Sequence, residues 1–241
     1  MRFAGQVAIV TGAAGGIGLA TAQRFAAEGA TVALVDHDSD ALAATAAQIQ
    51  GDTMQVVCDV GDEGQVAAAV EQVLRRFGRL DVVVNNAGLM MFRPIEALSG
   101  ADWNQVLRVD LLGAFYFIKQ GFLHMPPGSA IVNVASVHAL KTEPNVAPYA
   151  AAKAALLSLT RSAAIEGIPK GIRVNAILPG AVDTPMLWNN PQVKSGTEHL
   201  DAAEVGKPAE VAAAIAFLAS SEASFIQGAS LLVDGGRLCQ L

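Results

Sequence analysis

The chain has 241 residues, 52% of them hydrophobic, and a formal net charge of -6. Its 22 acidic and 16 basic residues are spread along the sequence, which excludes the clustered lysine and arginine of a nucleic-acid-binding surface. No apolar run reaches the roughly 18 residues of a membrane-spanning helix, and an early polar turn interrupts the segment that would serve as a signal peptide.

Short runs of β-branched residues alternate with longer alanine- and leucine-rich stretches of helical period. The expected strands are, in chain order, residues 7–11, 31–36, 53–59, 81–86, 129–136, 171–179 and 230–236. Runs such as "VAIV" are apolar at every position, as in strands that are covered on both faces. The alternation predicts a doubly wound α/β fold with a central parallel sheet of about seven strands and helices on both faces. Residues 1–241 are expected to form a single domain.

The first strand is followed by "TGAAGGIG", which places Gly12, Gly16 and Gly18 before a helix. Glycines permit a tight turn, let backbone amides approach a pyrophosphate, and leave a helix N-terminus to hold negative charge. With 23 glycines in the chain the pattern alone is weak. Its position between a strand and a helix makes it a predicted dinucleotide site.

The second strand ends at Asp36, where a Rossmann fold needs a carboxylate to accept hydrogen bonds from ribose hydroxyls. Asp38 and Asp40 follow without a nearby lysine or arginine, so a 2′-phosphate would meet like charge. The segment therefore favours NAD over NADP. Helix capping is an alternative role that suits Asp38 better than Asp36.

The segment "HALKTEPNVAPYAAAK" places Tyr149 four residues before Lys153, on one face of a helix that starts near Pro148. Such a pair is either a packed tyrosine beside a solvated lysine, or a catalyst in which the ammonium stabilises a phenolate. Ser136 ends the expected fifth strand, where its hydroxyl polarises a substrate carbonyl or acts only as a turn residue.

The segment 181–206 is long for a connection and is expected to be a substrate loop or lid. Trp188 within it suits a lid or a subunit contact, and His138 suits either substrate binding or a structural role. His124 and His199 have no partners at metal-ligand spacing, so no catalytic metal is expected. Two cysteines without a disulfide framework make a reducing cytoplasm the expected location.

Together these motifs resemble the short-chain dehydrogenase/reductase family in its single-domain form, over nearly the whole chain. The resemblance is carried by Thr11-Gly12-x-x-x-Gly16-x-Gly18, Asp36, Asp59-Val60, Asn85-Asn86-Ala87-Gly88, Ser136, Tyr149-x-x-x-Lys153, Pro179-Gly180 with Thr184, and Val233-Asp234-Gly235-Gly236.

The resemblance implies a role for each matching residue. Tyr149 would be the general acid/base, Lys153 would lower its pKa and bind the nicotinamide ribose, and Ser136 would hold the substrate oxygen. The implied NAD-binding residues are Gly12, Gly16, Ile17, Gly18, Asp36, Asp59, Val60, Asn86, Ala87, Gly88, Tyr149, Lys153, Val182 and Thr184.

One position departs from the family pattern. In the fourth long helix the family usually has Asn, whose main-chain carbonyl helps to hold a water that relays protons, and "VDLLGAF" places Asp110 there. The main-chain role survives this change. A buried carboxylate would instead raise its own pKa or pair with Arg108 or Lys153. Asp110 is therefore carried as a fourth catalytic candidate.

The function expected from these residues is hydride transfer between NAD and a secondary alcohol such as a polyol, sugar or hydroxysteroid. The alternatives are a 3-oxoacyl-thioester reductase and, from another class, a noncatalytic NAD sensor. The expected partners are a small-molecule substrate and further copies of the chain in a dimer or tetramer, with neither nucleic acid nor membrane.

Overall fold

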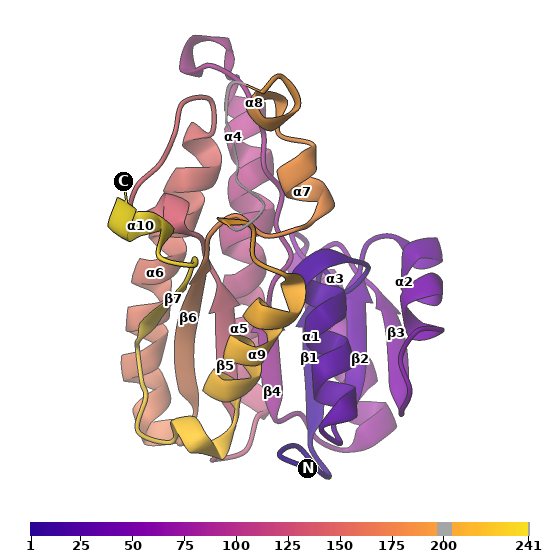
Figure 1. Ribbon diagram of the computed structural model, residues 1–241. Coiled ribbons are helices and arrows are strands. Elements are labelled where there is room, and N and C mark those ends of the chain that lie inside the picture. The colour runs from indigo at the N-terminus through magenta and orange to yellow at the C-terminus, as the bar shows by residue number, and fades with distance from the viewer. Residues whose placement is uncertain (197–203, 241) are drawn as a thin grey trace.

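The computed structural model describes residues 1–196 and 204–240. In this part of the chain seven strands form one parallel sheet in the order β3-β2-β1-β4-β5-β6-β7 (Figure 1). The strands are β1 (Val7–Thr11), β2 (Thr31–Asp36), β3 (Thr53–Val57), β4 (Val82–Asn85), β5 (Ala130–Val134), β6 (Arg173–Pro179) and β7 (Ser230–Val233). The predicted doubly wound fold is confirmed.

Helices cover both faces of this sheet. The longer ones are α1 (Gly16–Ala27), α2 (Ser39–Ala46), α3 (Glu63–Phe77), α4 (Gly100–Leu107), α5 (Gly113–His124), α6 (Ala147–Gly167) and α9 (Pro208–Ala219). Figure 1 shows α1 and α9 in front of the sheet, with α5 behind it. The short helices α7 (Pro185–Trp188), α8 (Pro191–Lys194) and α10 (Arg237–Gln240) lie beyond the sheet edge. No described helix is long and apolar enough to span a membrane.

The strands are apolar at consecutive positions because each face of the sheet packs into its own core. In β1, Val10 belongs to one buried cluster together with Phe25 of α1. The preceding residue, Ile9, belongs to a second cluster with Val70 of α3 and Phe117 of α5. Alternate side chains therefore point to opposite helical layers.

The strand order reverses at β1, which pairs with β2 on one side and with β4 on the other. In a parallel sheet the carboxyl ends of all strands meet at one edge, and a ligand crevice opens where the order reverses. The segments after β1, β4, β5 and β6 carry the motifs singled out in the sequence. The fold brings these motifs to the same edge.

Several strands end earlier than predicted, and one difference matters for the site. The fifth strand was expected to run to Ser136, but β5 ends at Val134. Ala135 still donates a backbone hydrogen bond to Ile177 of β6. Ser136 then takes an extended conformation, and its hydroxyl accepts a hydrogen bond from the His138 amide at the start of the 3-10 turn η3 (Val137–Ala139).

The predicted substrate loop is partly helical, since α7 and α8 form within it. A parallel bridge between Val182 and Gly206 joins its two ends. The Trp188 indole nitrogen donates to the Asp183 carboxylate at 2.7 Å, so Trp188 is anchored to the loop itself. Residues 197–203 of this loop lie outside the described part of the chain.

Candidate functional site

A cavity of about 480 Å³ opens at the carboxyl edge of the sheet. Twelve of the residues predicted from the sequence line it, namely Gly12, Gly16, Ile17, Asp36, Asn86, Ala87, Gly88, Ser136, Tyr149, Lys153, Val182 and Thr184. Gly18, Asp59, Val60 and Asp110 are not part of this lining. The tertiary structure thus gathers residues from six separate segments around one space.

The glycine turn after β1 is fixed by contacts that leave no room for a side chain. The Asn86 amide nitrogen donates to the carbonyls of Thr11 at 2.9 Å and Gly12 at 3.3 Å. A Cβ on Gly12, which has a φ of 64°, would lie 2.8 Å from that nitrogen. A Cβ on Gly18 would lie 2.0 Å from the Gly12 carbonyl oxygen. Gly18 therefore acts through close packing of α1 on the turn.

Asp36 is held at the end of β2 by backbone amides. Its Oδ1 accepts from the His37 amide at 2.8 Å and from the Asp38 amide at 3.3 Å, and its Oδ2 accepts from the Ala14 amide at 3.1 Å. The residue is 9% exposed and lines the cavity. Its carboxylate is thus oriented by the turn that it faces. Asp38 caps α2, as the alternative interpretation expected.

Asp59 and Val60 follow β3, the neighbour of β2 in the sheet. The Asp59 carboxylate accepts from the Arg108 guanidinium at 2.7 Å and from the Gly61 amide at 2.9 Å. Val60 lines a second, much smaller cavity of about 10 Å³, which Asp110 also lines. Asp59 therefore orders its own loop and ties it to the helical layer that carries Arg108.

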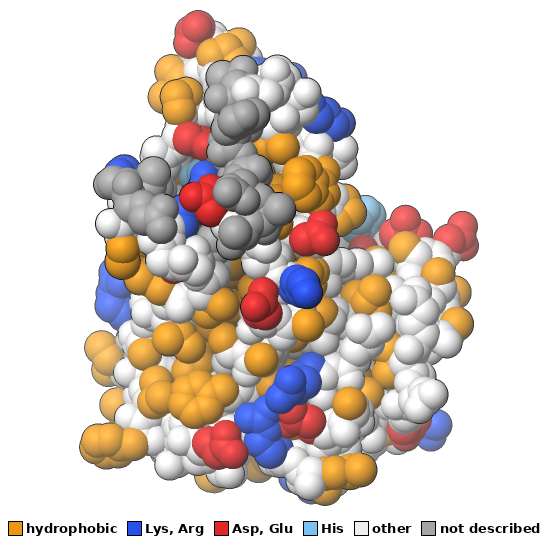
Figure 2. All heavy atoms as spheres, in the orientation of Figure 1, with side chains coloured by type: hydrophobic (Ala, Val, Ile, Leu, Met, Phe, Trp, Pro, Cys, Tyr) orange, Lys and Arg blue, Asp and Glu red, His pale blue; other side chains and the backbone are white. Residues whose placement is uncertain are grey.

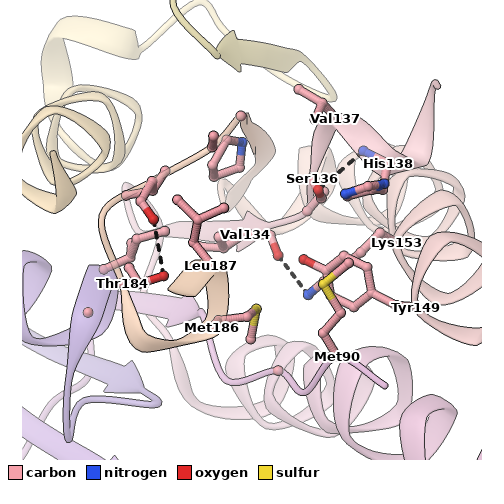
Figure 3. Close-up of a pocket in the computed structure, with 18 of the residues that line it drawn as sticks. Met90, Val134, Ser136, Val137, His138, Tyr149, Lys153, Thr184, Met186 and Leu187 are labelled. Atoms are coloured by element: carbon pink, nitrogen blue, oxygen red, sulfur yellow. Dashed lines mark hydrogen bonds between the residues drawn. The ribbon is translucent and has the colours of Figure 1, made fainter. Parts of the chain in front are cut away.

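Tyr149 and Lys153 lie on the first turns of α6, which begins at Ala147 with Pro148 in its first turn. Tyr149 is 7% exposed and Lys153 is 3% exposed. The Lys153 ammonium donates to the Val134 carbonyl at 3.1 Å and lies 5.5 Å from the centroid of the Tyr149 ring. The alternative in which Lys153 is solvated is wrong, because Lys153 is buried against the end of β5. Figure 3 shows Tyr149, Lys153 and Ser136 around one space.

The acidity of Tyr149 depends on opposing effects. Burial raises the pKa of the phenol, and the Asp110 charge raises it further. The Lys153 ammonium and a hydrogen bond with Ser136 act in the opposite direction. For Lys153, burial by itself lowers the pKa, but the Asp110 and Tyr149 charges outweigh burial and raise it. The lysine therefore carries its charge inside the protein.

Asp110 lies between α4 and α5 in a π-helical turn, η2 (Arg108–Leu112), and not in a regular helix as expected. Such turns insert one extra residue and re-aim side chains. The Asp110 side chain is fully buried, with Oδ1 3.2 Å from the Lys153 nitrogen and Oδ2 accepting from the Leu89 amide at 3.0 Å. Of its two expected partners, Lys153 is the one that it contacts, because Arg108 pairs with Asp59. Burial raises the pKa of Asp110, and the Lys153 charge opposes this.

His138 lines the cavity and packs against the catalytic candidate. Its ring lies edge-on to the Tyr149 ring, with 5.8 Å between centroids. Its Nδ1 lies 3.2 Å from the Thr142 hydroxyl. This position near Tyr149 is compatible with both roles that the sequence left open.

Sequence reasoning missed a buried polar chain beneath the site. Asn85 donates to the Asn133 side chain at 2.8 Å, and Asn133 donates to the Thr160 hydroxyl at 2.8 Å. The chain ties β4 and β5 to α6. The signal was present in "AIVNVAS", where one asparagine interrupts a strand that is otherwise apolar. The apolar lining by Met90 and Phe92 was also missed. Among the described residues, no group of three or more His, Cys, Asp or Glu is arranged to hold a metal.

Comparison with known proteins places this site in a family. A family model described as enoyl-(acyl carrier protein) reductase matches residues 12–237. The cis-4-hydroxycyclohexanecarboxylate dehydrogenase of Sinomonas cyclohexanicum is 42% identical, over 97% of this chain and 97% of its own. The meso-2,3-butanediol dehydrogenase of Serratia marcescens is 39% identical, over 98% and 96%. The chain belongs to the short-chain dehydrogenase/reductase family.

Solved structures agree with this assignment. A 3-ketoacyl-(acyl-carrier-protein) reductase from Brucella melitensis in complex with NADH is 35% identical with a TM-score of 0.89, covering 98% of this chain and 99% of that one. A short-chain dehydrogenase from Burkholderia cenocepacia in complex with NADP is 32% identical with a TM-score of 0.89, covering 98% of each chain. This family member is therefore an oxidoreductase of CH–OH groups, with a nicotinamide cofactor.

The close approach of α1 to the glycine turn predicts a sharp difference between two glycines. Gly18→Ala should lower the free energy of unfolding by about 1–3 kcal/mol, the usual cost of overpacking, and should weaken cofactor binding. Gly15→Ala is the matched control, because a Cβ there meets no atom within 4 Å and its φ of -177° suits any residue. Thermal unfolding without cofactor measures the difference, and equal melting temperatures for the two variants would contradict it.

Proposed function

We propose that this protein catalyses reversible hydride transfer between a secondary alcohol and NAD, with Tyr149 as general acid/base. The observation that carries the proposal is that Ser136, Tyr149 and Lys153 line the same cavity as the glycine turn and Asp36. A module that only bound a dinucleotide would have no need of a buried lysine beside a tyrosine. This weighs against the noncatalytic sensor.

The residues present fit a nicotinamide dinucleotide. The main chain at Gly12 and Gly16 borders the cavity without side chains. A Cβ on Gly12 would collide with Asn86, and Gly16 has a φ of 53° that favours glycine. The Asp36 carboxylate, oriented by backbone amides, suits hydrogen-bond donors such as ribose hydroxyls. When bound, the cofactor supplies the acceptor or donor of the hydride.

The chain's own residues then handle the proton and the substrate oxygen. In alcohol oxidation, the Tyr149 oxygen would accept the hydroxyl proton as the carbinol C–H bond breaks. The Ser136 hydroxyl would donate a hydrogen bond to the substrate oxygen and fix its position. Lys153 would stabilise the phenolate by its charge, from a position fixed by the Val134 carbonyl. Carbonyl reduction reverses each step.

The wall around Tyr149 indicates the kind of alcohol. Met90 packs against the small cluster that contains Tyr149, and Val137, Met186 and Leu187 also line the cavity (Figure 3). Hydroxyl groups next to the carbinol carbon would lose their hydrogen bonds against such a surface. Among the classes expected from the sequence, we therefore favour a hydroxysteroid over a sugar or polyol, and we add alicyclic secondary alcohols of similar surface.

A 3-oxoacyl-thioester reductase is the second candidate, favoured by the likeness to the Brucella melitensis reductase. The net charge of -6 opposes it, because an acidic carrier protein needs a basic docking surface. The spacing of Tyr149 and Lys153 does not bear on this candidate; it opposes a separate one, the enoyl reductase branch, in which the spacing from tyrosine to lysine is longer.

Replacing the proposed acid/base tests the function directly. Tyr149→Phe should lower kcat about 10²- to 10⁴-fold, since it removes the proton acceptor but keeps the ring. The measurement is the absorbance of NADH formed from a panel of alicyclic alcohols, hydroxysteroids, diols, sugars and 3-hydroxyacyl thioesters, with calorimetry to show that NAD still binds. Tyr116→Phe is the matched control, because these are the chain's two tyrosines.

Each outcome of the panel has a meaning. Full activity in Tyr149→Phe would refute the acid/base assignment, and turnover of thioesters alone would favour the second candidate. Binding of NAD without turnover of any compound would favour the sensor.

The preference for NAD over NADP is the finer part of the proposal, and it rests on Asp36. Asp36→Asn should lower the ratio of kcat/KM for NAD to kcat/KM for NADP more than about tenfold, because the repulsion of a 2′-phosphate is lost. Asp52→Asn removes an exposed carboxylate that precedes β3, at the opposite end of the sheet from Asp36, and should leave the ratio almost unchanged. A wild-type preference for NADP would contradict this assignment.

We further propose a cytoplasmic homo-oligomer, a dimer or a tetramer. Hydrophobic side chains gather at the lower left of Figure 2, near β7 and the segment before it in Figure 1. Phe225 is fully exposed there, and Leu231 and Leu232 of the edge strand β7 are 37% and 43% exposed. Exposed apolar sheet edges of this kind are usually covered by another chain. The free cysteines Cys58 and Cys239 suit a reducing compartment.

Sedimentation measures the assembly. We expect a dimer or tetramer, and Leu232→Lys should shift it toward the monomer because a buried unpaired charge opposes association. A wild-type chain that sediments as a monomer at micromolar concentration would refute the proposed assembly. Lys207→Glu, on an exposed residue before α9, is a charge-changing control that should not shift it.

A further inference from the structure

We propose that Asp110 is a positioning residue that neutralises the Lys153 charge and so keeps Tyr149 protonated at neutral pH. The consequence is that the site is poised to donate a proton to a carbonyl, whereas alcohol oxidation needs a more alkaline solution. The inference rests on the proposed role of Tyr149, but it concerns a residue that need not touch substrate or cofactor.

The geometry places a carboxylate from the turn η2 against Lys153, which shares helix α6 with Tyr149. Asp110 Oδ1 lies 3.2 Å from the Lys153 nitrogen, and the exposed fractions of the two side chains are 0% and 4%. No water-filled space separates these two atoms at that distance, so their charges interact with little screening. Asp110 Oδ2 is fixed by the Leu89 amide at 3.0 Å.

The chain around Gly88 fits closely against the carboxylate. A Cβ on Gly88 would lie 2.7 Å from Asp110 Oδ1 and 3.3 Å from the Lys153 nitrogen, so the absence of a side chain at Gly88 makes room for the pair. The π-helical turn η2 presents Asp110 inward, between α4 and α5. The pair is thus built by three separate segments: the one after β4, η2 and α6.

The charges of Lys153 and Asp110 affect how readily the Tyr149 phenol loses its proton. A lone ammonium beside Tyr149 favours the phenolate, whereas an ammonium paired with a carboxylate favours it much less. The Asp110 charge also acts on Tyr149 directly and raises its pKa. Both effects have the same sign, and both disfavour the phenolate that alcohol oxidation requires.

Other titratable groups lie near Tyr149 and Lys153. His138 packs edge-on against the Tyr149 ring from the η3 side, and its protonation would favour the phenolate. Arg108, on the same turn as Asp110, is bound to Asp59 on the far side. Asp36, Lys141, Glu143 and Arg237 also line the cavity that holds Tyr149 and Lys153. Among the titratable groups of the described structure, Asp110 is the one that forms an ion pair with Lys153.

The kinetic test compares the wild type with Asp110→Asn over a range of pH. The amide keeps the size of the side chain and can still accept from the Leu89 amide, but it removes the negative charge. On the acidic limb of the profile, Asp110→Asn should oxidise the alcohol about tenfold faster than the wild type, because more Tyr149 is phenolate. On the alkaline limb, it should reduce the ketone about tenfold more slowly.

Opposite changes in the two directions distinguish this role from a merely structural one. A loss of activity that is equal in both directions at every pH would overturn the proposal, and so would an unchanged profile. Glu71→Gln is the matched control, since it removes one exposed carboxylate of α3 that pairs with Arg75 and should leave both profiles unchanged.

A second measurement does not depend on turnover. Since the chain has two tyrosines, Tyr116→Phe leaves Tyr149 as the single phenol, and its tyrosinate absorbance reports its titration directly. With Asp110 present, the midpoint should lie above the ordinary value of about 10, and Asp110→Asn or Asp110→Ser should lower it. Circular dichroism at each pH restricts the reading to folded protein.

These results separate the inference from the proposed function. A wild-type midpoint at or below the ordinary value would overturn the inference even if neither Asp110 variant folded. Full activity of Tyr149→Phe would instead refute the acid/base role, while the absorbance titration would still report whether Asp110 acts on Tyr149. A lowered midpoint with opposite kinetic changes supports both.

Discussion

The structure of the site depends on one buried positive charge. The Lys153 ammonium is almost completely removed from solvent, which would be unfavourable by several kcal/mol without partners. Its partners come from different parts of the chain: the Val134 carbonyl at the end of β5 and the Asp110 carboxylate in η2. To keep the ammonium charged, the first turns of α6 must stay against the sheet edge. The position of Tyr149 follows from this constraint.

A second constraint acts at the other end of the cavity, where helix α1 packs closely against the glycine turn after β1. The Asn86 side chain binds the carbonyls of the glycine turn, and α1 packs so close to that turn that Gly18 has no room for a methyl group. Thr11 accepts hydrogen bonds from the amides of Asn86 and Ala87, which links β1 to the segment after β4. The proposed cofactor surface is therefore rigid. It combines the main chain of the glycine turn with the Asp36 carboxylate, and the Asn86 and Thr11 side chains hold the turn in place.

Between these two ends, polar and apolar side chains both line the cavity. Polar groups such as Asp36, Ser136 and Tyr149 share the cavity with the apolar side chains of Met90, Met186 and Leu187. Methionine adapts its shape easily, so such a wall can accept hydrocarbon of more than one outline. The general chemistry of CH–OH oxidation belongs to the polar groups. In the proposed function, the apolar side chains would select among alcohols.

The sequence alone determined the class of fold and most of the proposed site. Strands that are apolar at every position require helices on both faces, and the carboxyl ends of parallel strands must share an edge, so Gly12, Asp36 and Tyr149 could be placed together without coordinates. Asp36 could be proposed as a ribose-binding residue because a carboxylate at the end of the second strand commonly accepts hydrogen bonds from ribose hydroxyls in this fold. The ends of strands were less certain. Ser136 was assigned to β5, although the chain leaves the sheet after Ala135, because a hydrogen bond to the next strand carries no signal in the sequence.

The tertiary structure alone decided how the charges are paired. The sequence allowed Asp110 to pair with Arg108, its near neighbour, or with Lys153, far along the chain, and only the inward turn of η2 selects Lys153. The polar chain from Asn85 through Asn133 to Thr160 likewise depends on two strands and a helix meeting side by side. Periodicity in a sequence reports which face of an element is buried. It does not report which buried polar groups meet, because that depends on the relative positions of elements that are distant in the chain.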